Sequence, residues 1–204
     1  MRVHVSRSVT MNTTAIKQQY TPEDLLTMPD GDRFELVDGE LVERNMGWES
    51  SRVGGRLLGY LFEFCEPKQL GWLAPADASY QCFPDDPDKV RKPDVSFVRL
   101  ERLPAHQRPE GHCPIAPDLA VEVVSPNDLY SEVEAKVDEY VRAGVQLVWV
   151  VDPPTRTVRA HRADGTVTDL NENDFLDGEN VLPGFRCRVS DLFRAPSQPS
   201  QQLA

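Results

Sequence analysis

Three segments near the middle of the chain are rich in apolar residues. They cover residues 91–98, 116–126 and 145–152. In an extended strand successive side chains face opposite ways, so Val95 and Phe97 share one face and Asp94 takes the other. Apolar residues on both faces are typical of a strand that is covered on both sides. We therefore predict three buried strands of one sheet.

A helix is predicted between the second and third strands. Its apolar stripe recurs at spacings of three and four, as expected for a helix that packs on a sheet, and consists of Tyr130, Val133, Val137 and Tyr140. Asn127 or Asp128 is the expected cap at its start, and Gly144 the expected end with a positive φ. A strand, helix and strand of this length predict a right-handed crossover between parallel, neighbouring strands.

The flanking sequence predicts shorter elements. Thr21 caps a short helix that reaches Met28, with a proline in its first turn. Residues 33–44 form a hairpin around Asp38-Gly39. Residues 48–66 form a helix with several glycines, which indicates close packing against a neighbour. We expect one or two strands in 71–83 and an antiparallel pair around the turn at Asp164-Gly165.

The length of 204 residues suits one domain with a sizeable core. The polar segment 1–19 is expected to be a flexible leader, and 195–204 a disordered tail. The domain is therefore expected to span 20–194. Its predicted fold class is α/β, a mixed sheet flanked by helices, with an antiparallel N-terminal hairpin and additional C-terminal strands.

Two carboxylates lie within the predicted strands. Glu122 has only apolar neighbours along its strand, and Asp94 begins the first strand after Pro93. An unpaired buried carboxylate costs several kcal/mol or becomes protonated. A divalent cation shared by Glu122 and Asp94 would offset that cost, because Mg²⁺ prefers carboxylate oxygens and retains waters. A cationic side chain is an additional way to balance the charge.

Lys136 is the cationic side chain that the helix offers. It borders the apolar stripe, one residue before Val137, so its stem can lie on apolar surface while the ammonium reaches the strand ends. The alternative is an ordinary helix pair with Glu132, four residues earlier, worth about 0.2 to 0.5 kcal/mol. Asp94 has an alternative as well, as a cap of a turn.

The chain resembles the PD-(D/E)XK nuclease superfamily, which has the restriction-endonuclease-like fold, and within it the Uma family of restriction-endonuclease-like proteins. The order and spacing of several motifs carry this resemblance, over roughly 20–193. They are Tyr20–Leu26, Phe34–Glu43, Pro93-Asp94-Val95, Pro117–Pro126, Lys136 with Glu139-Tyr140, Ala143-Gly144-Val145, Trp149–Pro153 and Leu182-Pro183-Gly184.

The resemblance implies an Mg²⁺- or Mn²⁺-dependent endonuclease that hydrolyses DNA, often as a homodimer. Asp94, Glu122 and the main-chain carbonyl of Val123 would be the metal ligands. The superfamily's strand lysine is replaced by Val124 here, and the resemblance implies that Lys136 takes over its role. It also places Glu35 with the acidic residues as a metal or water ligand, whereas the hairpin alone allows an exposed charge.

The charge of the chain supports a rival interpretation. A net charge of -11 argues against a protein that coats nucleic acid through bulk electrostatics. It does not exclude a nuclease, because a metal-charged cleft and a local basic strip can act within an acidic molecule. The rival is a catalytically degenerate nuclease fold that binds nucleic acid or protein. Candidates for a basic strip are Arg44, Arg52, Arg56, Arg91, Lys92, Arg99, Arg102 and Arg108.

Other classes find little support in the sequence. The four cysteines form no Cys-x-x-Cys pair, which favours a reducing compartment over a zinc site, and the spacing of His106, His112 and Cys113 is unlike that of known zinc sites. No glycine-rich phosphate loop follows a strand. Without a secretory signal or an apolar run of membrane-spanning length, a cytoplasmic location and no membrane partner are expected.

Overall fold

The structure is a computed structural model that describes residues 19–44 and 47–195. The leader predicted at 1–19 and the tail predicted at 195–204 lie outside the described residues, apart from Gln19 and Ala195. None of the described helices is both long enough and apolar enough to cross a membrane.

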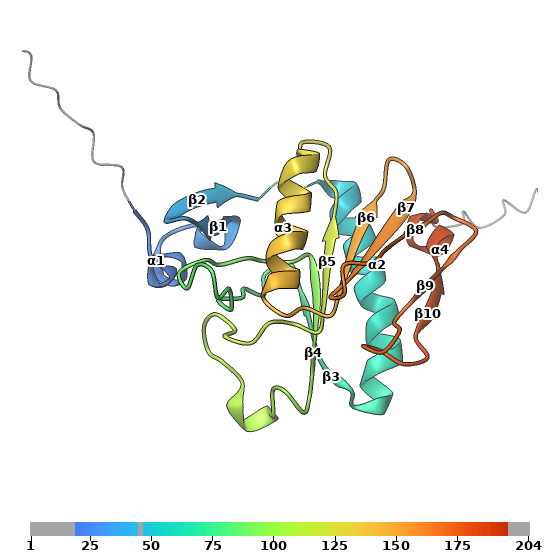
Figure 1. The fold of residues 1–204 in the computed structure, drawn as a ribbon, viewed down its shortest axis with the longest axis horizontal. Helices are drawn as coiled ribbons and strands as arrows, with labels where there is room; N and C mark the ends of the chain where they lie inside the picture. Colours follow the sequence, from blue (N-terminus) through green and yellow to red (C-terminus); the bar gives the residue numbers. More distant parts are fainter. Residues whose placement is uncertain (1–18, 45–46, 196–204) are drawn as a thin grey trace, which may run out of the picture.

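A six-stranded mixed sheet forms the centre of the molecule (Figure 1). Its strand order is β3-β4-β5-β6-β7-β8, and only β5 and β6 run parallel. The strands are β3 (Gly71–Pro75), β4 (Val95–Arg99), β5 (Leu119–Val123), β6 (Leu147–Asp152), β7 (Thr157–Arg162) and β8 (Val167–Leu170). The predicted parallel neighbours and the pair β7–β8 are confirmed, and 71–83 holds one strand.

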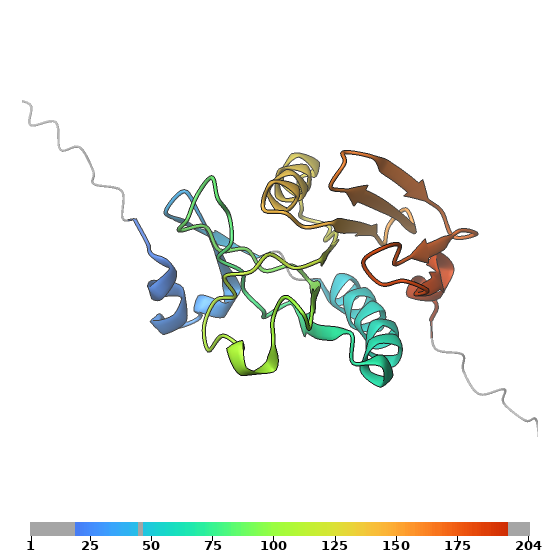
Figure 2. The same ribbon diagram turned by 60° about the horizontal axis from the view of Figure 1, so that its bottom comes forward.

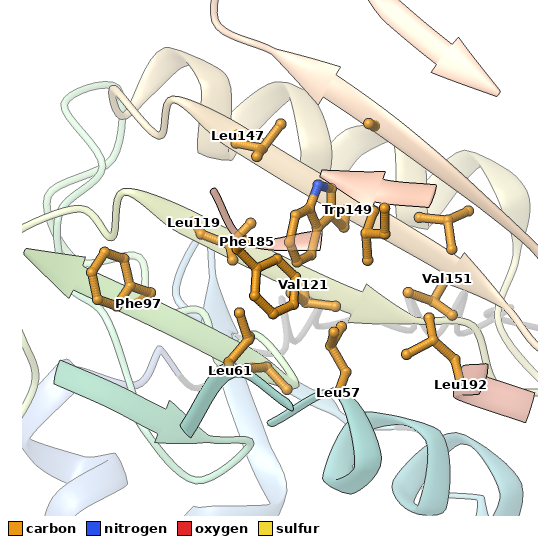
Figure 3. Close-up of a cluster of buried hydrophobic side chains, with 14 of the residues drawn as sticks. Leu57, Leu61, Phe97, Leu119, Val121, Leu147, Trp149, Val151, Phe185 and Leu192 are labelled. Carbon is orange, nitrogen blue, oxygen red and sulfur yellow. The ribbon is translucent and has the colours of Figure 1, made fainter. Parts of the chain in front are cut away.

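Two helices cover opposite faces of this sheet (Figure 2). Helix α2 (Trp48–Cys65) packs on one face, where its leucines meet the inward residues of β4, β5 and β6 (Figure 3). Helix α3 (Tyr130–Arg142) packs on the other face through Val133, Val137 and Tyr140. The central strands β4, β5 and β6 are thus buried on both faces, as their apolar composition predicts.

Helix α2 contacts the end of the sheet at Gly54. A Cβ at Gly54 would lie 3.7 Å from Val123 Cγ2 and 4.0 Å from the Cβ of Asp94. Asp94 therefore lies beside α2 and departs from the predicted alternation, because it precedes β4 and its N–H donates to the carbonyl of Val121. The distances at Gly54 are ordinary van der Waals distances, and Gly55 and Gly59 face open space, so the prediction that the glycines of α2 mark unusually close packing is wrong.

The start of α3 differs from the prediction. Leu129 is the N-cap residue and makes no side-chain cap bond, because Asp128 accepts a hydrogen bond from the N–H of Ser125 in the preceding turn. Tyr130 is 66% exposed and is not part of the buried stripe; its hydroxyl accepts a hydrogen bond from Arg159. The predicted end at Gly144 is confirmed, with φ +95°.

The predicted N-terminal hairpin forms from β1 (Phe34–Val37) and β2 (Glu40–Glu43). Asp38 and Gly39 turn with φ 51° and 76°, the left-handed conformation that two-residue hairpin loops favour. Leu36 pairs with Val90 and ties the hairpin to the segment before β4. Before the hairpin lie α1 (Pro22–Thr27), capped by Thr21 as predicted, and the 3₁₀ turn Gly31–Arg33.

The C-terminal part closes the core over α2. It contains β9 (Phe175–Asp177), β10 (Arg186–Arg188) and α4 (Val189–Phe193). The antiparallel pair β9–β10 is separate from the central sheet. Leu182, Phe185 and Leu192 are buried in the same cluster as α2, and the ring of Phe185 stacks on that of Trp149 at 6.0 Å. Further 3₁₀ turns cover Glu66–Lys68 and Ala105–Gln107.

Candidate active site

The predicted acidic residues meet at the carboxyl end of β5. Asp94 stands directly before β4, the antiparallel neighbour of β5. Its Oδ2 accepts a hydrogen bond of 2.7 Å from the N–H of Val123, and its Oδ1 lies 3.3 Å from Nη2 of Arg44. The carboxylate is therefore fixed to Val123 at the end of the neighbouring strand, the residue that directly follows Glu122.

Glu122 points to the opposite face, toward α3. The residue is 7% exposed. Its Oε1 accepts a hydrogen bond of 2.7 Å from the hydroxyl of Tyr140, and its Oε2 lies 3.3 Å from Nζ of Lys136. Both donors come from α3. The buried residues Val133, Val137 and Tyr140 pack this helix on the sheet and so position the two donors. The predicted burial of Glu122 is confirmed.

Glu35 reaches the same cluster from β1. It is 1% exposed, so the alternative of an exposed hairpin charge is wrong. Its Oε2 lies 2.9 Å from Nη1 of Arg91 and 3.2 Å from Nζ of Lys136, and its Oε1 accepts a bond of 2.8 Å from the N–H of Lys92. The residue holds Lys136 in place, and its part as a metal or water ligand stays a prediction.

Lys136 joins two of the carboxylates. Its ammonium lies 3.2 Å from Glu35 and 3.3 Å from Glu122, so these residues and not Glu132 are its ionic partners. The side chain is 21% exposed and can also be reached from solvent. Sequence reasoning correctly placed this lysine beside the strand ends.

Sequence reasoning missed an outer layer of ionic contacts. Glu139 binds Arg91 at 2.7 Å and Lys89 at 2.8 Å, which fixes the arginine that holds Glu35. Tyr140 and Arg44 were also missed as partners of the two strand carboxylates. The signal for Glu139 and Tyr140 was their place three and four residues after Lys136, one helical turn along the same face.

The three carboxylates have different acidities. Burial, and then the charges of Asp94 and Glu35, raise the pKa of Glu122 to about 7, against the charge of Lys136 and the hydrogen bond from Tyr140. Burial also raises the pKa of Asp94. Burial acts on Glu35 in the same sense, but the charges of Lys136 and Arg91 outweigh it and lower its pKa. Burial therefore disfavours the charged form of both strand carboxylates.

Lys136 remains protonated in this setting. Burial lowers its pKa, but the charges of Glu122 and Glu35 outweigh that effect and raise the pKa above its ordinary value. A lysine that keeps its proton can donate hydrogen bonds and neutralise negative charge, and it cannot act as a base. Its chemistry is therefore electrostatic.

A pocket of about 210 Å³ opens onto this cluster. It lies between the hairpin and α3, and its lining includes Glu35, Arg44, Arg91, Glu122, Val123 and Lys136. Apolar side chains from both elements, among them Val37, Val42 and Val133, narrow it. The ionic residues are therefore recessed below the surface and still reachable by a small part of a substrate.

The donor set fits a hard divalent cation. Within the described parts of the chain, no three His, Cys, Asp or Glu side chains form a group that could hold a metal ion by themselves. Mg²⁺, however, needs only one or two carboxylates plus waters and substrate oxygens. Each carboxylate oxygen of Asp94 and Glu122 already accepts one contact and has a second lone-pair position for a metal.

Comparisons with known proteins agree with this architecture. The model of the Uma2 family, described as putative restriction endonuclease, matches residues 22–190. The chain is similar to the crystal structure of a putative nuclease belonging to DUF820 from Anabaena variabilis ATCC 29413. The two chains are 20% identical, with a TM-score of 0.72 over 85% of this chain and 97% of that chain. This likeness confirms the predicted nuclease-like fold. No curated protein matches.

Proposed function

The chain belongs to the Uma2 family, and we propose that it is a divalent-metal-dependent endonuclease that hydrolyses phosphodiester bonds in DNA. The proposed nuclease domain spans 20–194, close to the matched range 22–190. The observation that carries the proposal is the group of Asp94, Glu122 and Lys136 at the end of β5, where Glu122 is buried and Glu122 and Lys136 line a pocket that opens to solvent.

Asp94, Glu122 and the main-chain carbonyl of Val123 are the proposed ligands of Mg²⁺ or Mn²⁺. A bound divalent cation supplies positive charge at the scissile phosphate and lowers the pKa of a water that attacks it. The raised pKa values of Asp94 and Glu122 favour this assignment, because an added cation would stabilise both carboxylates in their charged form.

Lys136 is proposed to orient the attacking water and to neutralise charge that develops on the phosphate. Such a donor is effective when it is fixed before the reaction and shielded from bulk water. Glu35 fixes it from one side and Glu122 from the other. Arg91, held by Glu35 and Glu139, keeps the arrangement rigid. Because no side chain attacks the phosphate, no covalent intermediate is required.

A cleavage assay tests the proposal. Wild-type protein is incubated with supercoiled plasmid and with circular single-stranded DNA, in Mg²⁺ and in Mn²⁺. We expect wild-type cleavage of at least one substrate, and loss of it in Glu122→Gln and Asp94→Asn. Asp118→Asn is the matched control, because Asp118 is a buried carboxylate at the far end of the same strand.

The result that contradicts the nuclease proposal is wild-type protein that cleaves neither DNA with either metal. That result favours the rival function, a catalytically inactive nuclease fold that binds nucleic acid or protein, for which the net charge of -11 is the supporting observation. A homodimer and a cytoplasmic location stay predictions. Size-exclusion chromatography with light scattering tests the first, and fractionation of cells tests the second.

A further inference from the structure

Trp48 is the most exposed of the large apolar side chains in the described chain, at 79%. It begins α2 and its indole is open to solvent. The other two tryptophans have structural roles. Trp72 donates a hydrogen bond to the carbonyl of Leu103, and Trp149 is fully buried. At 79% exposure the indole buries little apolar area in the folded chain, so packing contributes little to the presence of a tryptophan here.

Helix α2 begins near the carboxyl end of β5, where the candidate active site lies, and Trp48 is its first residue. A Cβ at Gly47, its neighbour, would lie 3.2 Å from Oγ of Ser125, and the hydroxyls of Ser50 and Ser125 are 2.9 Å apart. Ser125 follows the end of β5. Helix α2 then runs from Trp48 to Gly54, the position that meets Asp94. Six residues correspond to about 9 Å along a helix axis.

Arginines gather next to Trp48 on α2. Arg52 forms a pair with Glu49 at 2.6 Å, and Arg56 donates to the main-chain carbonyls of Asp191 and Arg194. The hydrogen bond and charge of Arg52, with smaller contributions from Arg156 and Arg56, lower the pKa of Glu49. Two arginines and one carboxylate thus lie in the first turns after Trp48, an excess of positive charge in a chain that is acidic overall, and phosphates are ligands that arginines attract.

The recessed site favours a flexible strand over a rigid duplex. Glu35 is 1% and Glu122 7% exposed at a pocket of about 210 Å³, so a phosphate must enter the pocket to reach them. A duplex holds its phosphates on a stiff cylinder and keeps the faces of its bases covered. An unpaired strand can bend, and its bases can stack on an aromatic ring.

We propose that Trp48 is a stacking platform for a base of unpaired DNA, which positions the adjacent phosphate at the pocket. This inference rests on the proposed nuclease function and names its substrate class: DNA with a single-stranded or locally unpaired segment. The arginines near the start of α2 hold the neighbouring phosphates. Duplex DNA that lacks unpaired bases is the poorer ligand.

Binding to a labelled oligothymidylate, measured by fluorescence anisotropy in EDTA, tests the proposal without cleavage. We expect Trp48→Ala to bind roughly 5- to 150-fold more weakly, the range for loss of one stacked base. Trp48→Phe should retain most of the affinity because its ring still stacks. The matched control is Phe62→Ala, which removes a 37% exposed aromatic residue from the same helix, about 21 Å further along it.

Tryptophan emission is the second measurement. Oligothymidylate should quench wild-type emission, and Trp48→Phe should lose the quenching while it still binds. The proposal is overturned if Trp48→Ala binds as wild type does, or if a blunt duplex of the same length binds as tightly as the single strand. Because metal is absent, a wild-type protein that binds in this way but cleaves no DNA would contradict the nuclease proposal alone.

Discussion

Strand β5 buries a carboxylate at each end, and the two ends balance that charge differently. At the start, Asp118 has a side chain that is 2% exposed and faces Arg102 at 3.1 Å and Arg99 at 3.8 Å. It also accepts a hydrogen bond of 2.9 Å from the N–H of Arg99. Two arginine side chains, each about a third exposed, thus balance the charge of one carboxylate.

At the other end three carboxylates compete for their cations. Glu35, Asp94 and Glu122 meet Lys136 and two arginines, and one of those arginines also binds Glu139. The pKa of Glu122 rises to about 7 there, through burial and the neighbouring negative charges. At the start of β5 two cations face one carboxylate, whereas at the other end Glu35 and Glu122 share Lys136, and Glu35 and Glu139 share Arg91. Burial of a carboxylate therefore does not by itself mark a reactive site, whereas carboxylates that share a cation and have a raised pKa do.

The largest expected effect comes from a substitution that removes Glu35, the carboxylate that binds both Arg91 and Lys136. Glu35→Ala should lower the free energy of unfolding by about 3–5 kcal/mol, since it leaves the buried Arg91 short of a partner. Asp118→Ala should cost less, about 1–3 kcal/mol, because its arginines can turn to water. Urea unfolding of the metal-free proteins measures both. If Asp118→Ala lost as much free energy of unfolding as Glu35→Ala or more, the proposed difference between the two ends of β5 would be wrong.

Removal of the lysine ammonium should affect the reaction more than metal binding. Lys136→Met is expected to reduce the cleavage rate about 100- to 1,000-fold, the effect of losing one fixed donor to a developing charge. Lys68→Met, an exposed control on α2's side of the sheet, should cleave as wild type does. Single-turnover cleavage at saturating Mn²⁺ measures this. A Lys136→Met rate within a few-fold of wild type would exclude the proposed role.

The acidity of Glu122 predicts a pH window. Its pKa rises from 4.5 to about 7 on folding, so between these values the folded state binds more protons than the unfolded state. The stabilising contribution of Glu122 is complete below pH 4.5, falls as pH rises, and is lost above about pH 7. Its span is about 3 kcal/mol.

The contribution of Glu122 is measured in EDTA as the difference in free energy of unfolding between wild type and Glu122→Gln, at several pH values from 4.5 to 7. Wild type should lose stability relative to Glu122→Gln as pH rises, whereas Mn²⁺ affinity should increase over the same range, because the metal binds the ionised carboxylate. A constant difference between the two proteins from pH 4.5 to 7 would show that the pKa is not raised.

The smallest expected effect concerns one hydroxyl. Tyr140→Phe removes the 2.7 Å hydrogen bond to Glu122 and should cost about 1–2 kcal/mol, with a further rise in the pKa of Glu122. Tyr80→Phe is the matched control, because its buried hydroxyl donates to the neutral Ser96. Only Tyr140→Phe should move the pH midpoint of Mn²⁺ binding upward. The same midpoint in both variants would contradict this role of Tyr140.

Local patterns in the sequence predicted most of the fold. The three strands, the crossover helix and the hairpin follow from residues within a few positions of one another, and all are present. The cap of α3 was wrong because Asp128 bonds within the preceding turn instead. The separate pair β9–β10 was not predicted, since strands of three residues are too short for alternation to be recognised.

The candidate site was predicted in part. Glu122 was found because its burial could be judged from its neighbours along the strand, and Asp94 and Lys136 were found from their places at a strand start and beside an apolar stripe, together with the family resemblance. The environment of Glu35 could not be judged in this way, because it depends on Arg91, 56 positions away, and on the docking of the hairpin through Leu36. Such contacts are decided by the tertiary fold.

A calorimetric titration of Mn²⁺ into the wild-type protein tests the central claim, that Asp94 and Glu122 hold a divalent cation. The same titration is made with Glu122→Gln and with Asp118→Asn, which alters the balanced end of the same strand. We predict binding by wild type and Asp118→Asn, and none by Glu122→Gln. Wild-type protein that binds no Mn²⁺ above pH 7, or Glu122→Gln that binds it as tightly as wild type, would contradict the claim.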